Sequence, residues 1–449
     1  MSTEKPPAER AAEARVAATR IEAEGVDGVI VSWVDNAGVT RAKTVPVRGL
    51  ESAARWGVGA APCFDAFLVD DSLAPTASPV GDLRLVPDLT ALHRLAAQPG
   101  WAWAPGDRWT QHGEPHPGCQ RRFTRRAADA LAEHGLTVRA GIEVEWIVDG
   151  GEPGPAYGMR RLIGNSDYLR DLLRTLREQQ LTVLQLHPEY TEGQYELSVA
   201  PGGPVEAADT ALLVRHTVQA VSLRHGLRAS FAPVTSPDGV GNGGHLHLSL
   251  WRDGRNLGHG GTGPHGLTRE AEGFLAGVLA ELPALLALGA PSVASYLRLA
   301  PGRWSGPYRC WGLENREAAL RLITGSAPEQ ANAEIKCFDA AANPYLAVGG
   351  VLAAGLAGLR AALRLPAETT GDPGGGAGGA GGSEGSGGAA ERLPATLGQA
   401  VDALRASDVL RAAMGDQLWR AVLDVREAEI GRFADLDPAQ LVDAVRYRY

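Results

Sequence analysis

The sequence predicts an α+β fold, in which strands that carry acidic side chains alternate with helices. One observation is that five short segments place acidic or histidine side chains two residues apart, in contexts typical of β-strands. Another is that stretches with helical periodicity separate these segments. The five segments are Gly141–Trp146, His187–Glu189, Gln194–Glu196, Gly244–Ser249 and Glu334–Lys336.

Composition narrows the class of protein. The chain has 449 residues and 44% hydrophobic content, which is enough for one large domain or two with a substantial core. Its 52 acidic and 43 basic side chains give a net charge of -9, without a Lys/Arg cluster outside helices, so we expect no nucleic-acid partner. The 4 cysteines form no CxxC pair or disulfide-like framework, which favours a reducing cytoplasmic location.

The first part of the chain reads as a small helix-and-sheet unit. Its opening stretch is rich in Ala, Glu and Arg and lacks the apolar core of a secretory signal, so it predicts a surface helix. Gly28–Val45, with a turn at Asn36–Gly38, predicts a β-hairpin, and Gly81–Asp88 predicts a further strand. Pro and Gly punctuation between Trp103 and Gly118 predicts a domain boundary. The expected parts are an N-terminal helix at 1–24, a β domain at 25–112 and a catalytic domain at 113–449.

Helices are expected between and after the acidic strands. The run Tyr345–Leu359 is the most membrane-like, but it is shorter than the roughly 20 apolar residues that a span needs, so we interpret it as a buried helix and expect no membrane. The Gly-rich stretch 371–389 predicts a flexible surface loop, and Leu393–Tyr449 returns to helical periodicity. The other expected helices are Phe123–His134, Asp167–Gln180, Pro204–Arg224 and Arg269–Leu288.

The acidic segments predict a metal site. Because side chains two residues apart on a strand point to one face, five glutamates and a histidine can converge on one cavity. Such a cluster repels itself without cations, and oxygen ligands with one imidazole suit Mg²⁺ or Mn²⁺. The alternative for each segment alone is an ordinary half-exposed strand. The candidate ligands are Glu143, Glu145, Glu189, Glu196, His245 and Glu334.

Six segments resemble, in the same order, the glutamine synthetase family, and the similarity runs over nearly the whole chain. Each segment alone is weak evidence, but the ordered set is specific. The resemblance implies an N-terminal β-grasp domain followed by a glutamine synthetase-type catalytic α+β domain. The matching segments are Gly141–Glu145, His187–Glu196, Gly241–Ser249, Ser295–Gly302, Glu314–Arg321 and Glu334–Leu346.

The resemblance also implies roles for single residues. It places one divalent ion on Glu145, Glu189 and Glu196, and the other on Glu143, His245 and Glu334. The remaining roles are nucleotide binding by His247 and Ser249, phosphoryl contacts by Arg316 and Arg321, glutamate binding by Arg298 and Gly241, and a place near the transferring phosphate for Lys336.

The implied reaction consumes ATP and glutamate. ATP phosphorylates the γ-carboxylate of glutamate, and a nitrogen nucleophile opens the acyl phosphate to an amide. In this family the active site lies between neighbouring subunits of stacked rings, so the resemblance implies a large homo-oligomer.

The departures from the family pattern fall on the amine side. Ammonia-using members carry a glutamate shortly after the Pro-Gly, whereas Pro301–Pro307 contains no carboxylate. An aspartate that faces ammonium is expected near Ala61–Cys63, and Asp65 fits only with a gap. We therefore predict an organic amine acceptor, such as a polyamine, ethanolamine or another monoamine, with Trp304 against its carbon chain.

Two alternatives remain open at the level of sequence. One is an ordinary glutamine synthetase that uses ammonia. The other is a non-catalytic relative with a structural or regulatory role, which the complete set of metal positions disfavours. An assay of phosphate release with ATP, Mg²⁺, glutamate and a panel of amines distinguishes the three.

Overall fold

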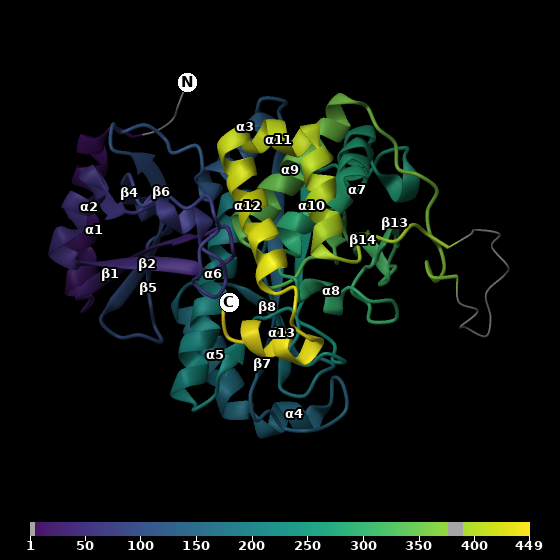
Figure 1. The fold of residues 1–449 in the computed structure, drawn as a ribbon, viewed down its shortest axis with the longest axis horizontal. Helices are drawn as coiled ribbons and strands as arrows, with labels where there is room; N and C mark the ends of the chain where they lie inside the picture. The colour runs from purple at the N-terminus through teal and green to yellow at the C-terminus, as the bar shows by residue number, and fades with distance from the viewer. Residues whose placement is uncertain (1–4, 376–388) are drawn as a thin grey trace.

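Two β-sheets organise the molecule. A computed structural model describes residues 5–375 and 389–449 of the chain. A six-stranded sheet near the N-terminus lies at one side of a larger domain built on a nine-stranded sheet (Figure 1). The predicted α+β class is confirmed.

The N-terminal domain is a mixed sheet with two helices on one face. Its strand order is β2-β1-β6-β4-β3, with β5 also paired to β6. The predicted hairpin is present, since β1 and β2 pair antiparallel, while β1 and β6 run parallel. The elements are α1 Pro7–Ala23, β1 Gly28–Val34, β2 Thr40–Pro46, α2 Leu50–Trp56, β3 Val58–Ala60, β4 Leu83–Pro87, β5 His93–Arg94 and β6 Trp101–Thr110.

One part of the boundary prediction is wrong. Pro105 and Gly106 do not mark a linker, because both lie inside β6, in the middle of the sheet. The glycine permits close packing rather than a turn, since a Cβ on Gly106 would lie 2.4 Å from Cδ1 of Leu85. The chain leaves the sheet only after Thr110.

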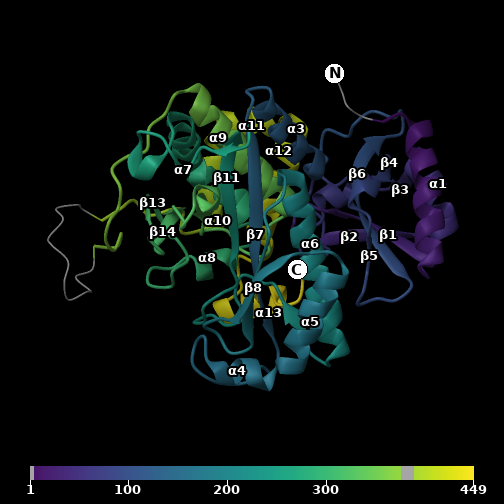
Figure 2. The same cartoon turned by 180° about the vertical axis from the view of Figure 1, so that it is seen from behind.

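The catalytic domain is built on the nine-stranded sheet. Its order is β13-β14-β15-β11-β7-β9-β8, and β10 and β12 pair with β7 and β11. Figure 2 shows the long strands β7 and β11 side by side through the middle of the molecule. The strands are β7 Thr137–Val148, β8 Val183–Pro188, β9 Gln194–Val199, β10 Ala229–Ser230, β11 Gly244–Arg252, β12 Arg255–Asn256, β13 Tyr308–Leu313, β14 Ala318–Ile323 and β15 Asn332–Ile335.

Helices cover this sheet, and the predicted ones are present, α6 with the predicted bounds and the others with ends shifted by a few residues. The pair α7 and α9 packs closely because both carry glycines at the contact: a Cβ on Gly277 would lie 2.3 Å from the Ala354 carbonyl oxygen. By length and composition α7 is apolar enough to cross a membrane, but 83% of its most apolar stretch is buried inside the fold. These helices are α3 Gln120–Ala132, α4 Met159–Gly164, α5 Ser166–Glu178, α6 Pro204–Arg224, α7 Arg269–Gly289, α8 Ser295–Arg298 and α9 Pro344–Arg360.

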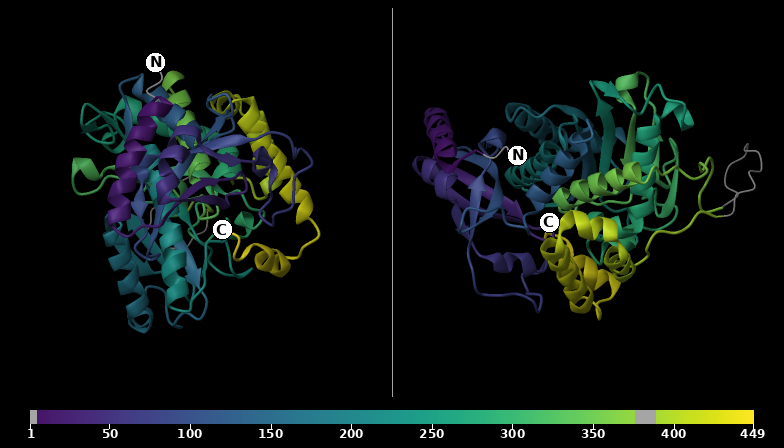
Figure 3. Two further views of the ribbon diagram at one scale, coloured as in Figure 1. Left: turned by 90° about the vertical axis from the view of Figure 1, so that its left-hand side faces the viewer. Right: turned by 90° about the horizontal axis from the view of Figure 1, so that it is seen from above.

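The C-terminal helices join the two domains. Figure 3 shows them, in yellow, against the catalytic domain and beside the N-terminal domain. Arg426 of α12 is fully buried, and it donates to the carbonyl oxygens of Ala287 (3.0 Å) and of Asn36 in the N-terminal hairpin turn (2.8 Å). The predicted loop at 371–389 falls mostly in residues 376–388, outside the described residues. The helices are α10 Leu397–Ala406, α11 Asp408–Met414, α12 Asp416–Arg432 and α13 Pro438–Val445.

Candidate active site

The register of the nine-stranded sheet brings acidic and histidine side chains to one face. His245 on β11 lies opposite Glu143 on β7, and Glu145 on β7 lies opposite Glu196 on β9. Glu334 on β15 lies opposite a second histidine of β11, two residues after His245. Because direct cross-strand neighbours are about 5 Å apart and residues two apart share a face, these groups converge.

The convergence lines a cavity of about 690 Å³. All six predicted metal ligands line it, as do all the other predicted site residues except Ser249. Ser249 shares the face of His247 but lies about 7 Å further along β11, and its hydroxyl accepts a hydrogen bond from the Trp251 indole at 2.8 Å. The predicted residues in the lining are Glu143, Glu145, Glu189, Glu196, Gly241, His245, His247, Arg298, Trp304, Arg316, Arg321, Glu334 and Lys336.

Two groups of side chains offer donor atoms close enough to share a cation. In the first, one atom each from Glu143, His247 and Glu334 lies within 4.8 Å of the others. Burial opposes ionisation of Glu143, but the nearby His247, whose Nε2 is 3.4 Å from a Glu143 oxygen, lowers the pKa of Glu143 to about 2. Arg321 Nη1 donates to Glu334 at 3.0 Å.

The second group consists of His187, Glu189 and Glu196. His187 Nε2 is 3.1 Å from Glu196 and Nδ1 is 3.3 Å from Glu189. Burial, together with the charges of Glu145 and Glu196, raises the pKa of Glu189 to about 7. Because burial and the neighbouring carboxylates destabilise the ionised form of Glu189, a divalent cation bound here would be strongly stabilising. Sequence reasoning did not assign His187 as a ligand.

His245 and Glu145 lie between these groups. His245 Nδ1 is 2.7 Å from Glu334 and Nε2 is 3.0 Å from Glu145. Burial and the charge of Lys336 oppose protonation, but the two carboxylates raise the pKa of His245 to about 9. The two close groups contain His247 and His187, whereas the predicted division uses His245 and Glu145, and that division stays a prediction. Carboxylates with imidazoles form a donor set that fits Mg²⁺ or Mn²⁺.

Basic side chains border the acidic face. Lys336 Nζ donates to Glu334 at 3.0 Å and lies 3.3 Å from His245 Nδ1. Arg298 is 4% exposed, and its Nη1 is buried without a hydrogen-bond partner among the described residues. A buried guanidinium with a free nitrogen is suited to bind a carboxylate or phosphate ligand.

The remaining side of the cavity is aromatic. Tyr157 stacks on His187 with ring centroids 4.9 Å apart, and its hydroxyl donates to Glu189 at 2.6 Å. Tyr190 meets the Trp304 ring edge-on, also with centroids 4.9 Å apart. Both tyrosines line the cavity, and sequence reasoning missed them because no period links them to the acidic strands. Asp65, the candidate for the ammonium-facing aspartate, does not line the cavity. Its carboxylate pairs with Arg108.

The family model "Glutamine synthetase, catalytic domain" matches residues 117–440, which is more than half of the chain. The chain belongs to the glutamine synthetase family. Among curated proteins of the family, the γ-glutamylpolyamine synthetase GlnA3 of Streptomyces coelicolor is 53% identical over 443 residues, covering 95% of this chain and 94% of the relative.

Solved structures of the family have the same fold. A "novel glutamine synthase homolog" superposes with a TM-score of 0.85 at 33% identity, covering 94% of this chain and 99% of the other. A GmaS/ADP complex superposes with a TM-score of 0.82 at 27% identity, covering 94% and 96%. The predictions of the family and of its two-domain fold are confirmed.

Proposed function

We propose that the protein is a γ-glutamylpolyamine synthetase, an ATP-dependent ligase that joins the γ-carboxylate of glutamate to an amine of a polyamine. The observation that carries this proposal is the contrast within one cavity. The acidic set needed for phosphoryl transfer is complete, whereas the loop that supplies a carboxylate in ammonia-using members presents Trp304. The 53% identical relative from Streptomyces coelicolor bears the same activity in its name.

Two divalent cations, Mg²⁺ or Mn²⁺, complete the acidic side in this proposal. The first would be held by Glu143, His247 and Glu334 and the second by His187, Glu189 and Glu196, with Glu145 and His245 between them. When bound, such cations neutralise charge on the phosphate oxygens during phosphoryl transfer.

The basic side chains bind the two anionic substrates. Arg316 and Arg321 line the cavity where they meet the phosphates of ATP, and Lys336 is held near them by Glu334. Arg298, with its free Nη1, binds the α-carboxylate of glutamate beside Gly241. Fixing both substrates in one orientation converts their reaction into an effectively intramolecular step.

We also propose that the protein acts as a cytoplasmic homo-oligomer and that a second copy covers an open groove beside β8. The groove has a volume of about 1360 Å³, and β8 is the last strand on its side of the sheet, so its outer edge is unpaired among residues 5–375 and 389–449. Met159, Ile163 and Leu184 are 68%, 66% and 61% exposed along it. Exposed apolar side chains beside an unpaired strand edge are typical of an interface.

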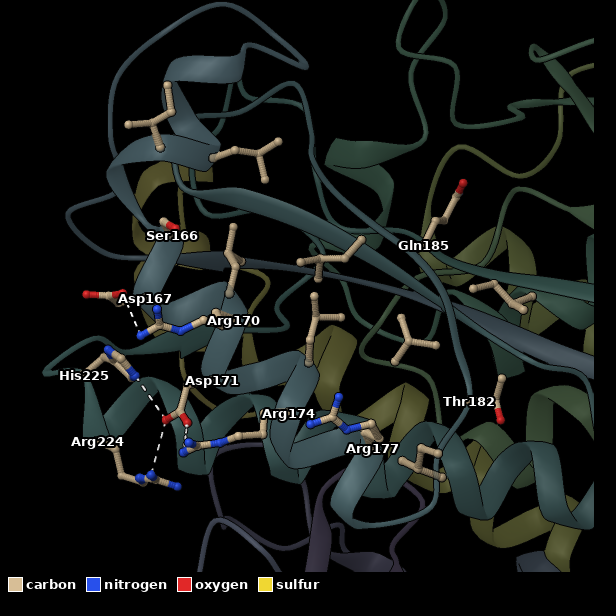
Figure 4. A pocket seen from close by; sticks show the side chains of 18 of the residues that line it. Ser166, Asp167, Arg170, Asp171, Arg174, Arg177, Thr182, Gln185, Arg224 and His225 are labelled. Atoms are coloured by element: carbon tan, nitrogen blue, oxygen red, sulfur yellow. Dashed lines mark hydrogen bonds and ion pairs between the residues drawn. The ribbon is translucent and has the colours of Figure 1, made fainter.

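The groove adjoins the active site. Gln185 of β8 lines both the groove and the catalytic cavity. Figure 4 shows Gln185 on the opposite side of the groove from the arginines of α5, of which Arg170 and Arg174 pair with acidic neighbours. A copy bound here would therefore reach the mouth of the cavity. Leu184→Asp should reduce both the oligomer mass measured by light scattering and the activity, and an unchanged mass would contradict the proposal.

The decisive experiment for the reaction measures phosphate release with ATP, Mg²⁺ and glutamate against ammonium, ethanolamine, butylamine, 1,4-diaminobutane and spermidine. The amide products are identified by mass spectrometry. We expect the highest kcat/KM with a polyamine. If ammonium is the best acceptor and no organic amine competes, the proposed function is wrong.

A further inference from the structure

Trp304 stands between two cavities. It lines the catalytic cavity, and it also lines a second cavity of about 660 Å³. Arg316 is shared in the same way, so these two side chains form the wall between the cavities. The second cavity is lined by the segment after Pro301, by the loop between β13 and β14 and by residues 370–374.

The wall presents apolar rings to the catalytic cavity. Trp304 and Tyr190 are 46% and 37% exposed, and they meet edge-on at 70°. Large aromatic side chains this open to solvent provide a surface for methylene groups and attract cations through their ring faces. This surface lies beside the Tyr157–Glu189 pair, since the Tyr157 and Tyr190 rings meet edge-on with centroids 5.9 Å apart.

The backbone of Trp304 is fixed from the side of the second cavity. Trp304 has a φ of 52°, which a tryptophan seldom adopts, and its N–H donates to Glu317 Oε1 at 2.8 Å. The other carboxylate oxygen of Glu317 is buried and has no hydrogen-bond partner among the described residues. By contrast, Glu314 in the same cavity pairs with Arg321 at 2.9 Å. Glu317 thus offers a free acceptor immediately behind the aromatic wall.

A polyamine needs such an acceptor. Only its reacting nitrogen must lose a proton to attack the acyl phosphate, while its other amines keep a pKa of about 10, as in lysine, and stay charged. A carboxylate beyond the aromatic wall can pair with the distant charge without holding the reacting nitrogen in its protonated form.

We propose that the acceptor spans the wall at Trp304, with its reacting nitrogen in the catalytic cavity, its methylene chain against Tyr190 and Trp304, and its far ammonium group on Glu317 in the second cavity. This inference rests on the proposed function and assigns the acceptor site within it. Glu317 is then a specificity-determining residue.

The test compares two acceptors that share a chain and differ in the far charge, 1,4-diaminobutane and butylamine. In Glu317→Gln, the oxygen that accepts the Trp304 N–H is retained but the charge is lost. We expect the ratio of kcat/KM for the diamine to that for butylamine to fall about tenfold. Glu329→Gln is the matched control, because Glu329 is exposed and lines neither cavity, and its ratio should equal that of the wild type.

A second pair of variants tests the wall independently of the charge. Tyr190→Leu should lower kcat/KM for both acceptors about tenfold, while Tyr190→Phe, which keeps the ring, should stay close to the wild type. If the wild type uses the diamine and neither Glu317→Gln nor Tyr190→Leu changes its kinetics, the inference is wrong and the proposed function stands. If the wild type forms no γ-glutamyl amide with any diamine or polyamine, both fail.

Discussion

The two sides of the catalytic cavity are built by different means. On one side, the acidic and histidine side chains stand on neighbouring strands of one sheet, where hydrogen-bonded register sets their spacing. On the other side, Tyr157, Tyr190 and Trp304 come from segments outside regular strands. In the proposed function, the strand side carries the groups for ATP chemistry and the loop side meets the acceptor.

This difference teaches where specificity can change. Moving a carboxylate on β7 or a histidine on β11 to a new place would require a shift of register, which turns all the side chains of that strand to the opposite face. Exchanging Trp304 alters only an exposed side chain of a connecting segment. A family can therefore keep its phosphoryl chemistry and change its nucleophile.

Removing one acidic side chain from the strand side should abolish most of the activity. Glu334→Ala removes a group that holds Lys336, Arg321 and His245 in place, and we expect phosphate release to fall at least about a thousandfold, or ~4 kcal/mol. Activity is measured by phosphate release at saturating Mg²⁺, with circular dichroism to establish folding. Near-normal activity in a folded variant would break the comparison, because the acidic face would then be structural.

Arg298, on the same side of the cavity, should affect glutamate binding more than ATP binding. In Arg298→Lys the buried planar fork is replaced by a single ammonium, so we expect the KM for glutamate to rise about 10- to 100-fold, with a smaller change in the KM for ATP. Arg309→Lys is the control, since Arg309 lies outside the cavity and donates to backbone oxygens. Equal changes in the two KM values would contradict a glutamate contact.

The pH dependence of metal binding tests whether the acidic face is a cation site. The pKa of Glu189 in the fold, about 7, lies above its ordinary value of 4.5. In the metal-free protein its contribution to stability is therefore fully present below pH 4.5 and is lost as the pH rises through about 7. The contribution of Glu189 should therefore lower the melting temperature of the metal-free protein as the pH rises from about 5 to about 8. Glu189→Gln provides the reference for the other titrating groups.

Mn²⁺ should reverse that trend, because it replaces the proton. Its affinity, measured by calorimetry, should rise up to about tenfold per pH unit below pH 7, and Glu189→Gln should flatten this dependence. An affinity that does not change between about pH 6 and pH 8 would show that the metal does not displace a proton from Glu189.

The loop side should allow exchange of the nucleophile. Trp304→Glu restores a carboxylate on the segment where ammonia-using members have one, so we expect the ratio of kcat/KM for ammonium to that for 1,4-diaminobutane to rise about tenfold. Trp304→Gln, which lacks the charge, is the control. If the two variants give the same ratio, charge at this position does not select the acceptor.

Much of the strand side could be predicted from the sequence, because period-two patterns determine which residues share a face. Helix α6 was predicted with the bounds that it has, since Pro204 opens it and Glu206 bonds back to the Gly203 N–H. The place of His187 could not be predicted. A register shift between Val183 and Gln185 precedes its pairing with Glu196, and a single sequence does not reveal such a shift.

The loop side was predicted only by what it lacks. The missing carboxylate after Pro301 indicated a different acceptor, and Trp304 was identified from its position. Tyr157 and Tyr190 meet His187 and Trp304 through contacts between segments that no periodicity connects. Ser249 was assigned to the nucleotide from the family resemblance, and the strand pattern gives its face but not how far the cavity extends along β11.

Arg426 makes the catalytic domain depend on the N-terminal domain. Its guanidinium is closed off from water and divides its hydrogen bonds between the core helix α7 and the hairpin turn of the N-terminal domain. Removing that domain would take away one backbone acceptor of this guanidinium, and a hydrogen bond to a charged group contributes more than an ordinary one. We therefore expect the catalytic domain to be less stable when it is expressed alone. A chimeric protein that contains the catalytic domain should also contain the hairpin turn at Asn36.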